Sequence, residues 1–225
     1  MLFRSIHRLI VTSATYRQSS RPSDDRARIR DPENLLLARA PRPRLPAEQL
    51  RDQALETAGL LDRAIGGEPV FPLQPDHYWE DRALPGKWVQ SVGGDRHRRS
   101  LYTYWRRMAL HPSLEILDAP ARTVCTARRT VSNGPTQALV TLNDPIFVEA
   151  ADAFALRILK ESGPGDSARL DRGFLLALGR GPSADERERL LEFLRRQRDR
   201  GLGDAAAWSR LAAVLLNLDE HLCRP

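Results

Sequence analysis

Residues 144–161, DPIFVEAADAFALRILKE, form the stretch that decides the fold. Asp144 is followed by Pro145, and a short polar side chain before a proline is typical of a helix start, because the carboxylate accepts unpaired amide hydrogens and proline fits the first turn. The segment then runs unbroken to Gly163-Pro164-Gly165, which ends it. This pattern predicts a long helix.

Similar start signals lie on both sides of this helix. Asn133 and Pro135 predict an N-cap and first turn for PTQALVTLN, residues 135–143. Ser183 and Glu186 have the spacing of a capping box before ADERERLLEFLRRQRDR, residues 184–200. Asn133 and Asp144 are therefore interpreted as capping residues rather than as chemical groups.

Helical patterns also occupy much of the remaining chain. The expected helices cover residues 2–17, 33–40, 46–67, 166–180 and 204–222, and the last is nearly apolar, which predicts deep burial. The predicted fold class is therefore mainly α, a multi-helix bundle.

Residues 68–132 interrupt the helical pattern with proline, glycine and aromatic residues. Because the segment is too long for a simple connector, we expect an ordered excursion packed on the helices. SLYTYWRR (100–107) and RTVCTARRT (122–130) could form a short β-hairpin within it. The chain thus divides into an N-terminal helical part (1–67), the excursion (68–132) and a C-terminal helical part (133–225), expected to form one compact domain that is a piece of a longer protein.

The composition restricts the class of protein. The net charge is +6, and 33 of the 35 basic residues are arginine. These arginines are scattered and often lie beside acidic residues. This distribution favours a GC-rich coding sequence that uses arginine in place of lysine over a concentrated basic surface that binds nucleic acid. We therefore do not expect nucleic acid as a partner. We expect no membrane span and no signal peptide within this chain, because no apolar run is long enough and the start lacks a cleavage pattern.

The polar cluster around the predicted helix start at Asn133 is the first candidate binding site, and Asn133 itself is one of its candidate residues. Arg128 and Arg129 precede it, and guanidinium groups beside a helix N-terminus suit an anionic ligand, although pairing with Asp118, Asp144 or Glu149 inside the fold is the competing interpretation. Capping does not explain two further polar residues in this region, which are predicted either to bond each other or to bond the excursion: Gln137 and Asn143.

Aromatic residues provide the second candidate site. Six of the eight tryptophans and tyrosines lie within positions 78–105, and exposed aromatic rings suit a sugar or a haem edge, whereas the alternative is a small second core under the excursion. The candidate binding residues in this set are Trp79, Tyr102, Tyr104 and Trp105. We predict no metal site, because DHYWED (76–81) lacks a diagnostic ligand spacing, and no catalytic motif occurs.

Several blocks in order carry a resemblance: IHRLIVTSATYRQSS (6–20), DPENLLLAR (31–39), QPDHYWE (74–80), RRSLYTYWRR (98–107), HPSLEILDAPAR (111–122), PTQALVTLNDP (135–145) and LLNLDEHL (215–222). Over essentially the whole chain they resemble the C-terminal planctomycete-specific (PSD-type) domain of unknown function found in planctomycete-type, cytochrome-c-associated proteins. Gly134 departs from that pattern, where the family usually has threonine.

The resemblance implies a longer, exported protein, located in the periplasm or at the cell surface. It implies haem c in an upstream domain and no cofactor in this chain, and it supplies no catalytic residue. The expected function is an accessory binding or scaffolding domain beside a haem-bearing or carbohydrate-active region, with the upstream domains as partners. The alternative is a catalytic domain of unrecognised type acting on an extracellular glycan or another anionic substrate.

Overall fold

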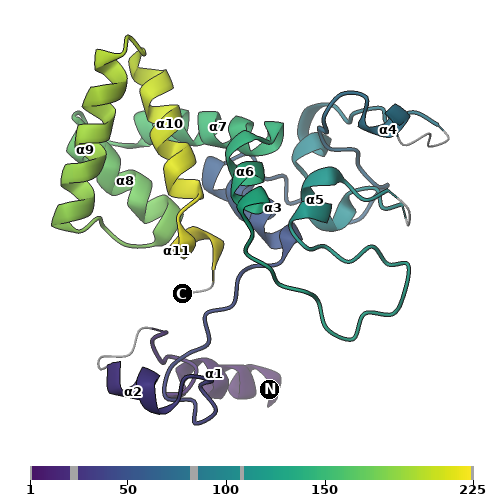
Figure 1. Ribbon diagram of the computed structural model, residues 1–225, viewed down its shortest axis with the longest axis vertical. Coiled ribbons are helices and arrows are strands. Elements are labelled where there is room, and N and C mark those ends of the chain that lie inside the picture. The colour runs from purple at the N-terminus through teal and green to yellow at the C-terminus, as the bar shows by residue number, and fades with distance from the viewer. Residues whose placement is uncertain (1, 21–24, 82–85, 107–108, 224–225) are drawn as a thin grey trace. The chain divides into compact units, whose positions relative to one another are not determined.

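The computed structural model describes residues 2–20, 25–81, 86–106 and 109–223, and it divides into two compact units. The first unit contains residues 1–44 and 223–225, and the second contains residues 45–222. The chain is mainly α-helical, as predicted (Figure 1). No sheet strand occurs among the described residues, where pairing is limited to isolated β-bridges.

The described residues of the first unit form the helices α1 (Leu2–Thr12) and α2 (Asp25–Arg30). The helix predicted over residues 33–40 is wrong, because the Asp31 carboxylate accepts hydrogen bonds from the amides of Leu35 and Leu36, both at 2.8 Å. This local capture replaces the helical hydrogen bonds of the segment. Asn34 and Leu37 take positive φ values of 54° and 53°, which turns the backbone into a tight loop.

The second unit is built around α7 (Pro145–Glu161). Its buried residues recur every three or four positions and so form one continuous apolar face: Ile146, Phe147, Ala150, Ala151, Phe154, Ala155 and Ile158. This face packs on α10 (Asp204–Leu216) and on α3 (Ala47–Ala58). The core of the second unit therefore lies along α7.

Two further helices, α8 (Asp166–Leu178) and α9 (Ala184–Asp199), complete the bundle with α10 at one end of this unit (Figure 1). Gly173 of α8 faces the neighbouring helices closely, since a Cβ built there would lie 3.1 Å from Ile158 Cδ1 and 3.2 Å from Leu215 Cδ1. The capping box of Ser183 and Glu186 is formed as predicted. The chain after α10 bends into the short helix α11 (Asp219–Leu222).

The helix predicted over residues 46–67 ends early, at Ala58. Gly59 has a φ of +76°, and the amide of Leu60 donates to the carbonyl of Leu55 at 2.8 Å, which closes the helix with a left-handed cap. Residues 60–67 continue without helix.

The described residues of the excursion follow an ordered path and form no β-hairpin, so that prediction is wrong. They include the short helices α4 (Tyr78–Asp81), η1 (Gly93–His97), η2 (Ser100–Tyr102) and α5 (Pro112–Ile116). Asp52 of α3 accepts a hydrogen bond from the amide of Ser100 at 2.7 Å, and the 3₁₀ turn η2 begins at this residue. Val70 then pairs with residues 102–104, whereas residues 122–130 form an exposed loop.

Candidate functional site

A groove of about 450 Å³ opens between α5, α6 (Pro135–Asn143) and the start of α7. We call it the α5–α6 groove. Most of its wall is proline and aliphatic side chain, with a few polar groups among them; the lining residues are Pro75, Pro112, Ser113, Ile116, Thr136, Leu139, Val140, Asn143, Asp144 and Pro145. It is a largely apolar depression with a small polar component.

Asp144 lies where the three helices meet. Its Oδ1 accepts a hydrogen bond from the amide of Ile146 at 3.0 Å, so the predicted N-cap of α7 is confirmed. Its Oδ2 accepts the hydroxyl of Ser113 at 2.5 Å and thereby joins α5 to α7. Burial raises the pKa of this carboxyl, while the hydrogen bonds from Ser113 and Ile146 oppose the shift. Asp144 therefore fixes the geometry of the groove.

Asn133 does not cap α6, and this prediction is wrong. The N-cap is Gly134, with extended backbone and no side-chain cap, and Asn133 is an exposed residue before it. Asn143 at the other end of α6 donates to the carbonyl of Leu139 at 2.9 Å and lines the groove.

Gln137 is buried, with 2 % of its surface exposed. Its Nε2 donates to the carbonyl of Ile116 at 3.0 Å, to Asp118 at 3.0 Å and to the hydroxyl of Ser132 at 2.8 Å. The prediction that it bonds the excursion is therefore confirmed. These contacts fasten α6 to the two ends of the exposed loop.

The two arginines before α6 lie in that exposed loop. Arg129 donates to Glu48 of α3 at 2.8 Å, so its acidic partner is none of the three carboxylates considered from the sequence. Arg128 is exposed in the same loop. Of these two arginines, neither lines the α5–α6 groove.

Arg51 of α3 forms the centre of a buried polar network that sequence reasoning missed. Its guanidinium donates to the carbonyls of Arg96 and Arg98, both at 2.9 Å, and to the hydroxyl of Ser100 at 3.2 Å. Burial lowers the pKa of Arg51 to about 10, so the side chain stays charged at neutral pH. The nearest carboxylate, Asp52, accepts both the amide and the hydroxyl of Ser100 at 2.7 Å.

A second set of charges ties the excursion to α7. Arg96 donates to both oxygens of Glu149 at 2.9 Å, and His97 Nε2 lies 3.2 Å from Glu149 Oε1. Residues 96–100 are thus held from α3 on one side and from α7 on the other. This network explains why a segment rich in proline and glycine is ordered.

The aromatic residues of the excursion mainly pack on each other. Phe71 stacks on Tyr104 with ring centroids 4.8 Å apart, and its edge meets Trp88 at 5.0 Å. Trp79 is 4 % exposed and lies 5.4 Å from Trp88. Buried His111 adjoins Trp88, and burial lowers its pKa to about 4, so it is neutral at pH 7. This is the small second core that was the alternative to a binding platform.

Two further rings of the excursion are covered by arginine. The guanidinium of Arg98 lies 4.1 Å from the centre of the Tyr102 ring, and that of Arg122 lies 3.8 Å from the centre of the Trp105 ring. The Tyr102 hydroxyl also accepts the amide of Gly66 at 3.0 Å. One face of each ring is therefore occupied by a cation–π contact.

A second groove, of about 570 Å³, is lined by charged and apolar side chains together, namely Asp52, Gln53, Glu56, Leu61, Arg63, Ile65 and Arg99. Its acidic residues are engaged, since Arg63 pairs with Glu56 at 2.5 Å and Asp52 holds Ser100. Among the described residues, no three His, Cys, Asp or Glu side chains gather closely enough to hold a metal ion.

The predicted site residues do not meet in one place. All of them belong to the described part of the chain, and Asn143 is the one among them that lines one of the two grooves. The residues that sequence reasoning missed are Arg51, Asp52, Ser100 and Ser113, and Glu149, which was considered as a partner of Arg128 or Arg129, pairs with Arg96 instead. One signal was present: Arg51 lies four positions from both Ala47 and Leu55, inside the apolar stripe of its helix, and such an arginine needs buried partners.

Comparison with known proteins identifies the class and goes no further. The family model PSD1, protein of unknown function (DUF1553), matches residues 2–194, so the chain belongs to this family of uncharacterised domains. No curated protein and no solved structure matches the chain. No helix of the described residues is both long enough and apolar enough to cross a membrane.

Proposed function

We propose that this chain is an accessory domain that binds and positions another polypeptide region through the α5–α6 groove. The observation that carries the proposal is the largely apolar groove itself, whose polar members Thr136 and Asn143 lie where they could hydrogen-bond an extended main chain. Two large apolar residues that line it, Ile116 and Leu139, are 41 % and 58 % exposed. Exposed apolar surface around a groove is typical of a protein-binding site.

The resemblance described above suggests the occupant. It is an extended segment of a haem-bearing or carbohydrate-active region, with haem c bound outside this chain, in a planctomycete-type protein exported to the periplasm or the cell surface. Direct binding of a glycan by the excursion has less support, because Trp79 is buried and the rings of Tyr102 and Trp105 already carry guanidinium groups.

Catalysis by the predicted polar residues also has less support. Arg129 is paired with Glu48, Gln137 is buried against the excursion, and the exposed Arg128 lies outside both grooves. These contacts stabilise the fold and do not direct the three side chains to one reacting centre.

A photo-crosslinking amino acid at Leu139, in the protein produced in its native cell, tests the proposal. Leu175 of α8 is a matched control position, since the two leucines are 58 % and 53 % exposed. We expect the probe at Leu139, and not the probe at Leu175, to cross-link to a polypeptide that mass spectrometry identifies as haem-bearing or carbohydrate-active. Equal cross-linking at both positions, or turnover of a glycan by the purified chain alone, would refute the accessory role.

A further inference from the structure

The first unit has almost no core of its own. Its large apolar side chains are between 47 % and 81 % exposed, and they are Phe3, Ile6, Leu9, Ile10, Val11, Tyr16, Ile29, Leu35, Leu36 and Leu37. Among the residues of this unit whose side chains are described, the buried one is Asp31, which is polar. So much exposed apolar surface marks an interaction site.

The helix α1 separates its apolar and basic residues. Phe3, Ile6 and Ile10 recur every three or four positions and so lie on one face. Arg4 and Arg8, one turn apart, lie on the opposite face. An amphipathic helix with phenylalanine and aliphatic residues on one side and arginine on the other is suited to lie in a bilayer surface.

The net charge of the protein lies in the same segment. Residues 1–44 contain ten arginines and four acidic residues, whereas residues 45–225 contain 25 basic and 25 acidic residues. The first acidic residue of the chain is Asp24, so residues 1–23, which include α1, contain arginine and no acidic residue. Anionic lipid head groups complement this charge, because a negatively charged membrane surface attracts clustered arginines.

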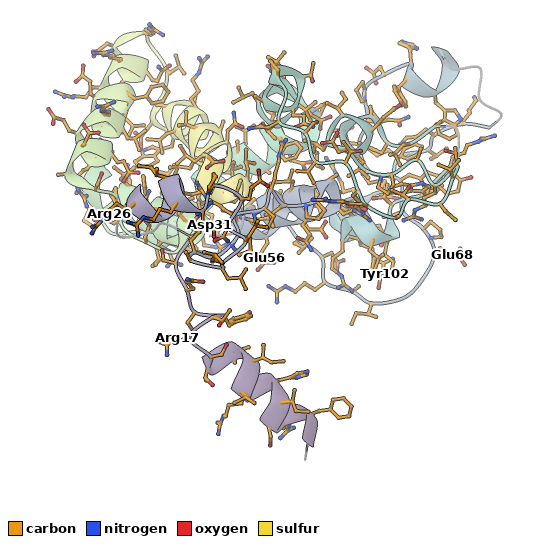
Figure 2. The ribbon with its side chains drawn as sticks, turned by 60° about the horizontal axis from the view of Figure 1, so that its bottom comes forward. Arg17, Arg26, Asp31, Glu56, Glu68 and Tyr102 are labelled. Carbon is orange, nitrogen blue, oxygen red and sulfur yellow. The ribbon has the colours of Figure 1, made fainter. Side chains whose placement is uncertain are left out.

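Residues 31–39, which we call the leucine loop, add a second apolar element to the unit. The carboxylate of Asp31, which Figure 2 labels, accepts hydrogen bonds from the amides of Leu35 and Leu36, and Arg39 donates to the carbonyls of Asp31 and Pro32 at 2.9 and 2.6 Å. Leu35 and Leu36 are each 81 % exposed. Because the loop is already ordered, inserting its leucines into an apolar phase requires little further loss of conformational entropy.

We infer that the first unit is a membrane-surface contact, in which the apolar face of α1 and the leucine loop insert into an anionic lipid bilayer. A second copy of this chain is a poorer occupant, because it would bring the same excess of arginine against the first. A bilayer supplies apolar depth and negative charge together and requires no matching shape.

Flotation of the full chain with lipid vesicles tests this inference. We expect binding to vesicles containing about 30 % phosphatidylglycerol, weak binding to pure phosphatidylcholine, and release at high salt, because the attraction is partly electrostatic. The double variant Ile6→Asp/Ile10→Asp should bind the anionic vesicles at least about ten-fold more weakly. The matched control Leu156→Asp/Leu175→Asp, two exposed leucines of the second unit, should bind as the unmodified chain does.

Four results would overturn the inference. They are absence of binding by the unmodified chain, equal losses in both double variants, a dimer in solution that Ile6→Asp/Ile10→Asp dissociates, and a lower melting temperature of that variant without vesicles. The third would mean that a second copy covers α1, and the fourth would mean that protein within the same chain covers it.

Discussion

Replacing Arg51 by methionine is the most direct test of the buried network. Methionine keeps much of the side-chain volume but removes the donors to the carbonyls of Arg96 and Arg98 and to Ser100. Each buried acceptor left without a donor costs about 1–3 kcal/mol. Asp52 also loses a nearby positive charge at 3.8 Å. Because Arg51 is buried and its three acceptors and Asp52 lose their partner together, we expect the free energy of unfolding to fall by about 3–5 kcal/mol.

Urea denaturation followed by far-ultraviolet circular dichroism measures that loss, and calorimetry should show a melting temperature lower by about 10 °C. Arg63→Met is the control, since it removes the same charge from an arginine whose side chain is 74 % exposed and whose partner is Glu56. It should leave stability unchanged within error, because exposed ion pairs contribute little. If the two variants unfolded at the same urea concentration, Arg51 would not be the residue that organises the excursion.

Two further predictions concern the caps and the acid response. Ser183→Ala should lower stability by about 1 kcal/mol in thermal unfolding, because it removes a formed capping box, whereas Asn133→Ala should change nothing, because Gly134 is the N-cap; a larger loss for Asn133→Ala would contradict this assignment. The hydrogen bonds from Arg180 lower the pKa of Glu186 from 4.5 to about 2. The stabilisation from this carboxylate is therefore complete above pH 4.5 and is lost as the pH falls towards 2, so the stability difference from Glu186→Gln should shrink over that window in an acid titration and would argue against the pairing if it stayed constant.

The helices after residue 133 could be predicted because their signals are local. Pro135 and Pro145 occupy first turns as expected, and α8 and α9 begin within one residue of their predicted starts. Proline and short polar residues set backbone geometry within a few positions, so the pattern can be recognised without knowing the tertiary fold.

The helix predicted over residues 33–40 and the predicted β-hairpin do not form, because side chains outside the local sequence pattern bind the backbone of these segments. In the segment 33–40, one carboxylate, Asp31, takes the amides that a helix would have used. In the excursion, Ser100 is held by Asp52, 48 positions earlier in the chain, and this contact replaces the expected strand with a 3₁₀ turn. β-propensity is weak evidence where such a long-range contact exists.

For the same reason, only part of the candidate site could be predicted from the sequence. Asp144 was recognised as a cap, but its bond to Ser113 joins helices 31 positions apart and has no local signature. The aromatic cluster was visible in composition, whereas its inward packing depends on Phe71, which the sequence did not single out.

The double attachment of residues 96–100 has a consequence for local opening. Arg51 holds this segment from α3 and Glu149 holds it from α7, and these two helices pack on each other. Residues 96–100 therefore belong to the same cooperative unit as the α3–α7 pair and cannot unfold alone without exposing charges on both. Their amide hydrogens should exchange with solvent no faster than those two helices separate, although no α-helix covers this segment.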